Sequence, residues 1–250
     1  MADTPYFRFT NAVIVAPLLA VLAIWTVFWL ELTLRINLND YGIYPQRLSG
    51  LKGIVISPFI HGSVEHLYNN TIPLAVLMAS LFYFYRKVAL RVLVVGVLLS
   101  GLFTWAVGRP SFHIGASGVI YLLASFIFFK GIRTKHYRLV ALSLVVVFIY
   151  GSMLWYIFPI EDGISWEGHL GGFLAGMLLA FVVKTPVPPI KKYDWERDDY
   201  DEEADEFLRQ FDEDGNFVGD RTKEEGQVNE IKIVYEYKKD IGHDKDAKRE

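Results

Sequence analysis

Cysteine is absent from the 250-residue sequence. Its absence excludes disulfides, thiolate catalysis and cysteine-based zinc sites, but it leaves the cellular compartment open. The N-terminus also lacks the basic segment, short apolar core and small-residue cleavage site that together mark a signal peptide. We therefore interpret the first apolar run, residues 12–34, as a retained membrane helix.

Acidic residues are scarce in the first three quarters of the chain and abundant in the rest. Residues 1–184 contain 13 Lys+Arg and 7 Asp+Glu, whereas residues 185–250 contain 12 Lys+Arg and 21 Asp+Glu. An acidic tail thus follows a basic core, and this balance argues against nucleic acid as a partner.

The composition is 52% hydrophobic and 15% aromatic, which is too apolar for an ordinary soluble domain of this size. A membrane helix needs about 20 mainly apolar residues. Six runs qualify, with the fourth and sixth the shortest: residues 12–34, 63–84, 89–108, 116–131, 138–158 and 167–184. The sequence therefore predicts an all-α polytopic membrane protein with a bundle of six transmembrane helices in the lipid bilayer.

This pattern divides the chain into three parts. We expect residues 1–11 to be a short cytoplasmic N-terminus and residues 12–184 to form the membrane domain. Residues 185–250 form an acidic, charged tail, which we expect to be cytoplasmic and either disordered or folded into a small element. Within it, the alternating segment 228–239 is a candidate strand.

Loop charges predict the orientation. Basic residues gather in the connections after the second and fourth spans and at the exit of the sixth. They are Arg86, Lys87, Arg91, Lys130, Arg133, Lys135, Arg138, Lys184, Lys191 and Lys192. The connection before the sixth span has Glu161, Asp162 and Glu167 and no basic residue. Despite opposing charges in the first loop and at Arg109, this distribution predicts cytoplasmic termini.

Three polar clusters interrupt the apolar runs, although polar groups inside a bilayer are costly. They are HGSVEHLYNN at 61–70, GASG at 115–118 and EGHLGGFLAG at 167–176. Each lies at the start of an even-numbered span, so all three should meet at one depth in the outer leaflet. Convergence of this kind is what a buried active site requires.

The residue types in these clusters suit nucleophilic catalysis. A serine hydroxyl needs a base to remove its proton, and His169 is the natural base for Ser117. A developing oxyanion needs fixed donors. Asn70 and His66 can offer side-chain N–H groups from one helix face, and Ser117 can add its own backbone N–H at the start of a helix.

The neighbouring residues have supporting roles in this hypothesis. Gly172 and Gly176 have GxxxG spacing, which allows helix backbones to approach closely. Gly115 and Gly118 would help from the facing helix. Tyr121 lies one turn after Ser117 and could pack against the imidazole of His169. His61 either precedes this helix or lies off the face of His66, so we assign it a structural or secondary role.

Each motif alone has a simpler explanation. GxSG and GxxxG are common in membrane helix packing, and a lone helix histidine is more often structural. The three clusters stand on alternate spans, in order and at one depth, which these explanations do not account for jointly. A transporter is a further alternative, but there is no inverted repeat and no charged pair at mid-membrane.

These residues resemble the rhomboid proteases. That family has a His-x4-His-x3-Asn pattern in its second core helix, matched by His61, His66 and Asn70. A GxSG opens the fourth helix, and a histidine before GxxxG spacing lies in the sixth; here these are residues 115–118 and 169–176. The resemblance covers about residues 12–184. One departure is that Leu51 and Lys52 stand where rhomboids often carry a Trp-Arg pair.

The resemblance implies a serine endopeptidase of the minimal six-helix bacterial type. Ser117 and His169 would be its catalytic dyad, and His66, Asn70 and the Ser117 backbone N–H its oxyanion hole. Its substrates would be single-pass membrane proteins, cleaved near the outer boundary of a bacterial inner membrane without metal or cofactor. The alternative is a catalytically silent relative that binds or escorts membrane helices.

Overall fold

The computed structural model describes residues 7–161, 163–186 and 193–219. The candidate strand at 228–239 and the first six residues lie outside the described residues. The chain divides into two compact units, Met1–Ile190 and Lys191–Glu250.

The first unit is helical and matches the six predicted spans. Its α-helices are α1 (Ala12–Leu34), α2 (Gly53–Ile56), α3 (Val64–Phe84), α4 (Ala89–Val107), α5 (Ser117–Thr134), α6 (Tyr137–Tyr150) and α7 (Trp166–Val182). Short 3-10 helices are η1 (Asn39–Tyr41), η2 (Leu48–Lys52), η3 (Ser57–Phe59) and η4 (Gly151–Ile157). By length and composition, α1, α3, α4, α5 and the continuous segment Tyr137–Ile157 can cross a membrane, and α7 is a shorter apolar helix of 17 residues. The predicted fold class is confirmed.

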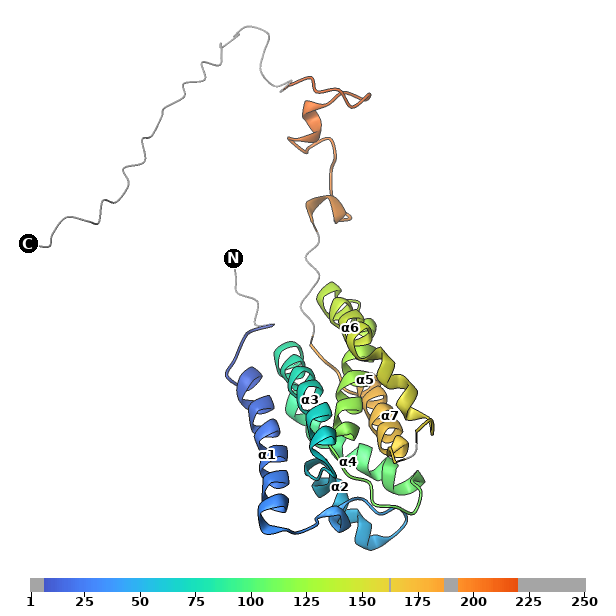
Figure 1. Ribbon diagram of the computed structural model, residues 1–250. Helices are drawn as coiled ribbons and strands as arrows, with labels where there is room; N and C mark the ends of the chain where they lie inside the picture. Colours follow the sequence, from blue (N-terminus) through green and yellow to red (C-terminus); the bar gives the residue numbers. More distant parts are fainter. Residues whose placement is uncertain (1–6, 162, 187–192, 220–250) are drawn as a thin grey trace, which may run out of the picture. The chain divides into compact units, whose positions relative to one another are not determined.

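Helix α5 forms the centre of the bundle (Figure 1). It packs against α3, α4, α6 and α7, while α1 lies outside against α3. Buried residues occur all around α5, as expected for a helix enclosed by others. The outer helices expose large apolar side chains instead, such as Leu22 and Trp29 on α1 and Phe148 on α6. An apolar outer surface suits hydrocarbon as the surrounding solvent.

Glycines set the closest helix contacts. A Cβ at Gly172 would collide with the carbonyl oxygen of Gly118, and one at Gly176 with the carbonyl oxygen of Leu122. Gly171 faces α4, where a Cβ would lie 2.7 Å from Oγ1 of Thr104. Only glycine therefore allows the backbone of α7 to lie this close to both neighbours.

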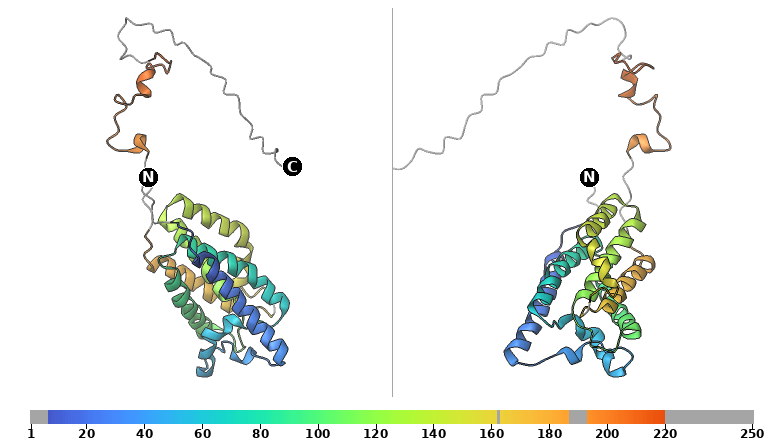
Figure 2. Two further views of the ribbon diagram at one scale, coloured as in Figure 1. Left: turned by 90° about the vertical axis from the view of Figure 1, so that its left-hand side faces the viewer. Right: turned by 45° about the vertical axis from the view of Figure 1, so that its right-hand side comes forward.

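The long connection between α1 and α3, residues 35–63, gathers at one end of the bundle (Figure 2). An antiparallel bridge joins Ile43 to His113 through two backbone hydrogen bonds of 3.0 and 2.9 Å. Two cation–π contacts hold the connection, with Lys52 over the ring of Tyr41 and Arg47 over that of Tyr44. These contacts fasten the loop by means other than a Trp-Arg pair.

Lys130 lies inside α5, although by sequence it counts among the basic residues of the following connection. The side chain is buried in the last turns of α5, and its Nζ donates to the carbonyl oxygens of Ala180 and Val183, at 3.1 and 2.5 Å. These carbonyls lie at the C-terminus of α7, where helix groups lack internal partners and favour a cation. Lys130 thus caps α7 rather than lying in solvent.

In the second unit, the described residues 193–219 contain two short 3-10 helices, η5 (Asp194–Glu196) and η6 (Leu208–Gln210). A single bridge pairs Phe211 with Phe217. Large apolar side chains remain exposed here, including Trp195 and Phe207. This sparse structure agrees with a segment too acidic to build an apolar core.

Candidate functional site

The loop before α5 fixes the position of Ser117. Gly115 has φ of +107°, a conformation that favours glycine, and its N–H donates to the carbonyl of Ser57 at 2.9 Å. The N–H of Ala116 donates to Nε2 of His61 at 3.4 Å. Ser117 is then the first residue of α5, so its backbone N–H has no partner within the helix.

His66 and Asn70 lie one turn apart at the start of α3, against this loop. The hydroxyl of Ser63 caps the helix by accepting from the His66 N–H at 3.1 Å. A Cβ at Gly115 would lie 2.7 Å from Nε2 of His66 and 3.7 Å from Nδ2 of Asn70. The absent side chain of Gly115 therefore lets α3 approach the segment that leads into Ser117.

Asn70 carries an unusual donor. Its side chain is buried, and Nδ2 has no hydrogen-bond partner within the part of the chain that the structure describes. A buried polar group without a partner costs free energy of folding, and such groups are rare enough to need an explanation. The amide is thus available to an acceptor that the folded chain itself does not supply.

His169 is held by two contacts. Its Nδ1 lies 2.9 Å from the carbonyl oxygen of Tyr156. A carbonyl can only accept, so Nδ1 carries the hydrogen and Nε2 retains a lone pair. The imidazole also stacks on the ring of Tyr121, with centroids 4.3 Å apart and planes 12° from parallel. The Tyr121 hydroxyl in turn donates to the carbonyl of Met153 at 2.5 Å.

This stack places the imidazole beside the start of α5, because Tyr121 follows Ser117 by one helical turn. Close packing supports the approach: a Cβ at Gly118 would lie 3.3 Å from the carbonyl of Gly168 in α7. Among the described residues, the Ser117 hydroxyl makes no hydrogen bond, and the His169 side chain makes one, through Nδ1. Catalytic hydrogen bonds are often long before substrate binds.

His61 lies behind the segment that leads into Ser117. It is 2% exposed, and its ring centroid is 5.0 Å from that of His66. Burial, reinforced by the nearby imidazole of His66, lowers the pKa of His61 to about 4, and the carbonyl of Phe59 opposes this shift. A neutral ring with its hydrogen on Nδ1 can accept from Ala116, in keeping with a structural role.

Comparison with known proteins decides the family. The family model described as Rhomboid domain matches residues 49–186, more than half of the chain. This chain belongs to the rhomboid family. Uncharacterized proteins of Mycobacterium bovis and Mycobacterium tuberculosis are 35% identical to it over 166 residues, and one of Mycobacterium leprae is 31% identical over 163.

The match to these relatives is partial. It covers 61% of this rhomboid chain, and 66% of the length of the M. bovis and M. tuberculosis relatives and 64% of that of the M. leprae relative. The family and the apolar helices together establish an integral membrane protein.

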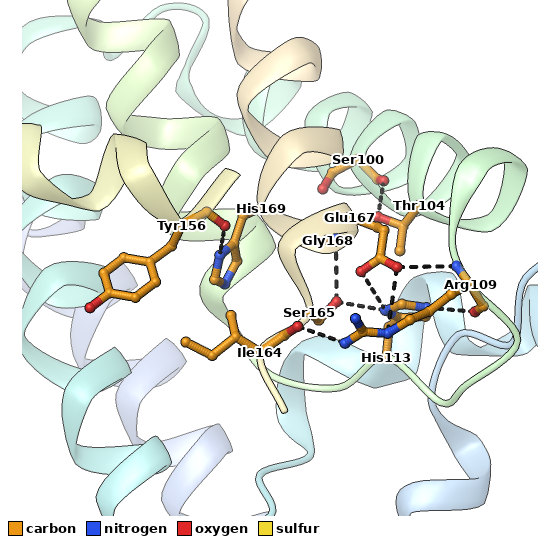
Figure 3. A network of polar contacts seen from close by, with 10 residues as sticks. All are labelled: Ser100, Thr104, Arg109, His113, Tyr156, Ile164, Ser165, Glu167, Gly168 and His169. Atoms are coloured by element: carbon orange, nitrogen blue, oxygen red, sulfur yellow. Dashed lines mark hydrogen bonds and ion pairs between the residues drawn. The ribbon is translucent and has the colours of Figure 1, made fainter. Parts of the chain in front are cut away.

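Sequence reasoning missed a polar network beside the rhomboid site, in which His113 and Glu167 are buried and Arg109 is exposed (Figure 3). It joins Arg109 and His113, in the loop before α5, to Ser165 and Glu167 at the start of α7. By sequence, Glu167 counts among the acidic residues of the outer connection and has no assigned role, but the structure buries it completely in the first turn of α7. One signal was present: a carboxylate two residues before a helix histidine, within an apolar run, needs a partner.

The described residues contain no group of three or more His, Asp or Glu side chains placed to hold a metal ion.

Proposed function

We propose that this rhomboid-family chain is an intramembrane serine endopeptidase that cleaves the membrane segments of single-pass proteins. The observation that carries the proposal is the state of His169. Its Nδ1 is bonded to the Tyr156 carbonyl and its ring is stacked on Tyr121, so its basic Nε2 lies beside the start of α5 without a partner among the described residues. A base held in one tautomer is what activation of a serine requires.

In the proposed reaction, Ser117 Oγ attacks a peptide carbonyl while His169 Nε2 accepts the hydroxyl proton. The carbonyl oxygen becomes an oxyanion, which the Asn70 amide, a His66 ring N–H and the Ser117 backbone N–H stabilise. When the tetrahedral intermediate collapses, His169 passes the proton to the leaving amine. Water then attacks the carbonyl carbon of the acyl-enzyme while His169 accepts a proton from that water. His169 returns the proton to Ser117 Oγ as the bond to the acyl group breaks, which releases the carboxylic acid product and restores the serine.

The substrate class follows from the setting. A helix entering sideways from the bilayer shields its peptide bonds and makes all its backbone hydrogen bonds. It must unwind near the outer leaflet before Ser117 can reach a carbonyl, so helix-weakening residues should favour cleavage. We assign this activity to residues 12–184, with cytoplasmic termini and an outward-facing site, and leave the acidic residues 185–250 outside it.

A fluorophosphonate probe tests this proposal without knowledge of the substrate. Purified wild-type chain should be labelled, and Ser117→Ala should not. Ser111→Ala, a serine in the loop before α5, serves as the matched control and should label as wild type does. Absence of labelling in folded wild type, or labelling that persists in Ser117→Ala, would favour a silent protein that binds membrane helices.

A second experiment addresses the reaction itself. Wild type and Ser117→Ala are compared for release of the soluble ectodomain of one membrane protein into the medium. Release that requires Ser117 supports proteolysis, whereas equal release by both would show that another enzyme cuts the substrate.

A further inference from the structure

The polar network of Figure 3 forms a continuous link between the nucleophile loop and the helix of the base. The backbone N–H of Arg109 donates to Oε1 of Glu167 at 3.2 Å, and the guanidinium Nε lies 3.6 Å from the same oxygen. Arg109 also donates from Nη2 to the carbonyl of Ile164 at 2.7 Å. Three contacts from Arg109 thus connect the loop before α5 to the N-terminal end of α7.

His113 supplies a second set of contacts in this link. Its Nε2 lies 3.1 Å from the carbonyl of Arg109 and must donate, because a carbonyl only accepts. Its Nδ1 lies 2.6 Å from the hydroxyl of Ser165, which caps α7 by accepting from the Gly168 N–H. Burial lowers the pKa of His113, which favours the neutral ring. A neutral ring that accepts from Ser165 gives a partner to both ring nitrogens and to the Ser165 hydroxyl.

Glu167 lies between these two sets of contacts, next to both Arg109 and His113. It is fully buried, and the second carboxylate oxygen, Oε2, has no hydrogen bond among the described residues and lies 4.0 Å from Nδ1 of His113. A buried carboxylate is expensive unless it is paired. Stability alone therefore does not account for its presence two residues before His169.

We propose that Glu167 is a positioning residue for the dyad, a role that rests on the proposed function. Through Arg109, it fixes the first turn of α7 against the loop that leads into Ser117. The separation of the His169 imidazole from the Ser117 hydroxyl depends on that contact. Because a misplacement of about 1 Å can cost roughly 100-fold in rate, loss of Glu167 should act on catalysis before it acts on the fold.

The test measures the reaction of Ser117 with a fluorophosphonate probe at several probe concentrations, which separates the maximal labelling rate from the probe's apparent affinity. Glu167→Ala should lower the maximal rate by about 10- to 100-fold and change the apparent affinity by less than about 2-fold. Glu167→Gln keeps an acceptor for the Arg109 N–H, so it should recover part of the rate. Glu161→Gln, an exposed carboxyl in the preceding loop, is the matched control and should be unchanged.

A double-mutant cycle separates positioning from general stabilisation. Arg109→Ala removes the guanidinium contact to Glu167 but keeps the backbone N–H bond, so it should slow labelling less than Glu167→Ala does. Adding it to Glu167→Ala should cause less loss than it causes alone, because the guanidinium–carboxylate contact is then already gone. Thermal unfolding of each variant shows whether the labelled protein is folded. If Glu167→Ala does not fold, Glu167→Gln and Arg109→Ala carry the comparison.

Two results are distinguishable in this design. Wild type that labels through Ser117, with folded Glu167→Ala, Glu167→Gln and Arg109→Ala reacting at the wild-type rate, overturns the positioning role and leaves the proposed function standing. Wild type with no Ser117-dependent labelling overturns the proposed function and the positioning role together.

Discussion

Asn70 buries an amide donor that no described residue accepts from, which is a costly arrangement for a folded protein. His66 lies one turn away on the same face of α3, and both approach the loop at Gly115. Polar groups held without partners inside a bilayer are commonly functional. At the residue scale, the site is thus marked more clearly by an unsatisfied donor than by a completed hydrogen bond.

Replacing Asn70 by alanine should therefore separate activity from stability. Removal of one oxyanion donor typically lowers turnover by about 100- to 1,000-fold. The melting temperature should stay the same or rise, because the variant no longer buries an unpaired amide. Rates of fluorophosphonate labelling and thermal unfolding provide the two measurements. The control is Asn69→Ala, an exposed neighbour; a fully active Asn70→Ala protein would contradict the assigned role.

His61 should make stability depend on pH. Its pKa is about 4 in the folded protein and 6.5 in the unfolded chain, so between these values the unfolded chain binds more protons. Stability then falls as pH drops from 6.5 toward 4. Melting temperatures measured across this range should decline less steeply for His61→Gln, which cannot take up the proton. Parallel curves for the two proteins would show that His61 does not contribute.

At this scale the candidate members of the site could be proposed from the sequence, but the contacts between them could not be predicted. Residue type and spacing single out Ser117, His169 and Asn70, because few polar residues interrupt the apolar runs. The partner of His169 Nδ1 is a backbone carbonyl, that of Tyr156, and any residue could have supplied it. Glu167 was misinterpreted because its partners Arg109 and His113 are 58 and 54 positions away in the sequence, and only the packed fold brings them together.

At the scale of elements, glycine governs the approach of α7 to α5. Cβ atoms at Gly172 and Gly176 would overlap backbone oxygens of the facing helix, so neither position has room for a side chain. The GxxxG spacing predicted this close contact. It could not predict that Gly171 would play the same part toward α4, because that requires the position of a third helix.

Gly172→Ala should push the two helices apart. Overpacking of this kind costs about 1–3 kcal/mol, and displacement of α7 should also slow labelling of Ser117. Gly151→Ala is a suitable comparison, because a Cβ there would make an ordinary 3.5 Å contact with Val147 and the backbone is helical. Thermal unfolding should show a clear loss for Gly172→Ala and almost none for Gly151→Ala. Equal melting temperatures would mean that the helices accommodate a methyl group freely.

At the scale of the whole molecule, the alternation of helix direction decides which side the site faces. The six spans could be predicted because bilayer thickness fixes a minimum apolar length. The 3-10 segment η4 and the capping role of Lys130 could not, since both depend on packing between helices. Lys130 also should not be counted among the loop charges that predict orientation, because this cation lies buried inside the bundle.

The cysteine-free sequence permits a direct test of orientation. In intact cells, a membrane-impermeant maleimide should label Glu161→Cys, in the connection predicted to lie outside. Tyr137→Cys, exposed at the start of α6, should react only after the membrane is permeabilised. Neither change removes a basic residue, so the charge bias that sets topology is preserved. The reverse labelling pattern would place the site at the cytoplasmic face.

Lys130 has a mechanical consequence for this arrangement. The ammonium group comes from α5 and binds two carbonyls at the C-terminal end of α7. At the other end of α7, the His169 imidazole stacks on Tyr121, which also belongs to α5. Helix α7 is thus anchored to the same neighbour near both of its ends, which restrains it from pivoting about its glycine contacts.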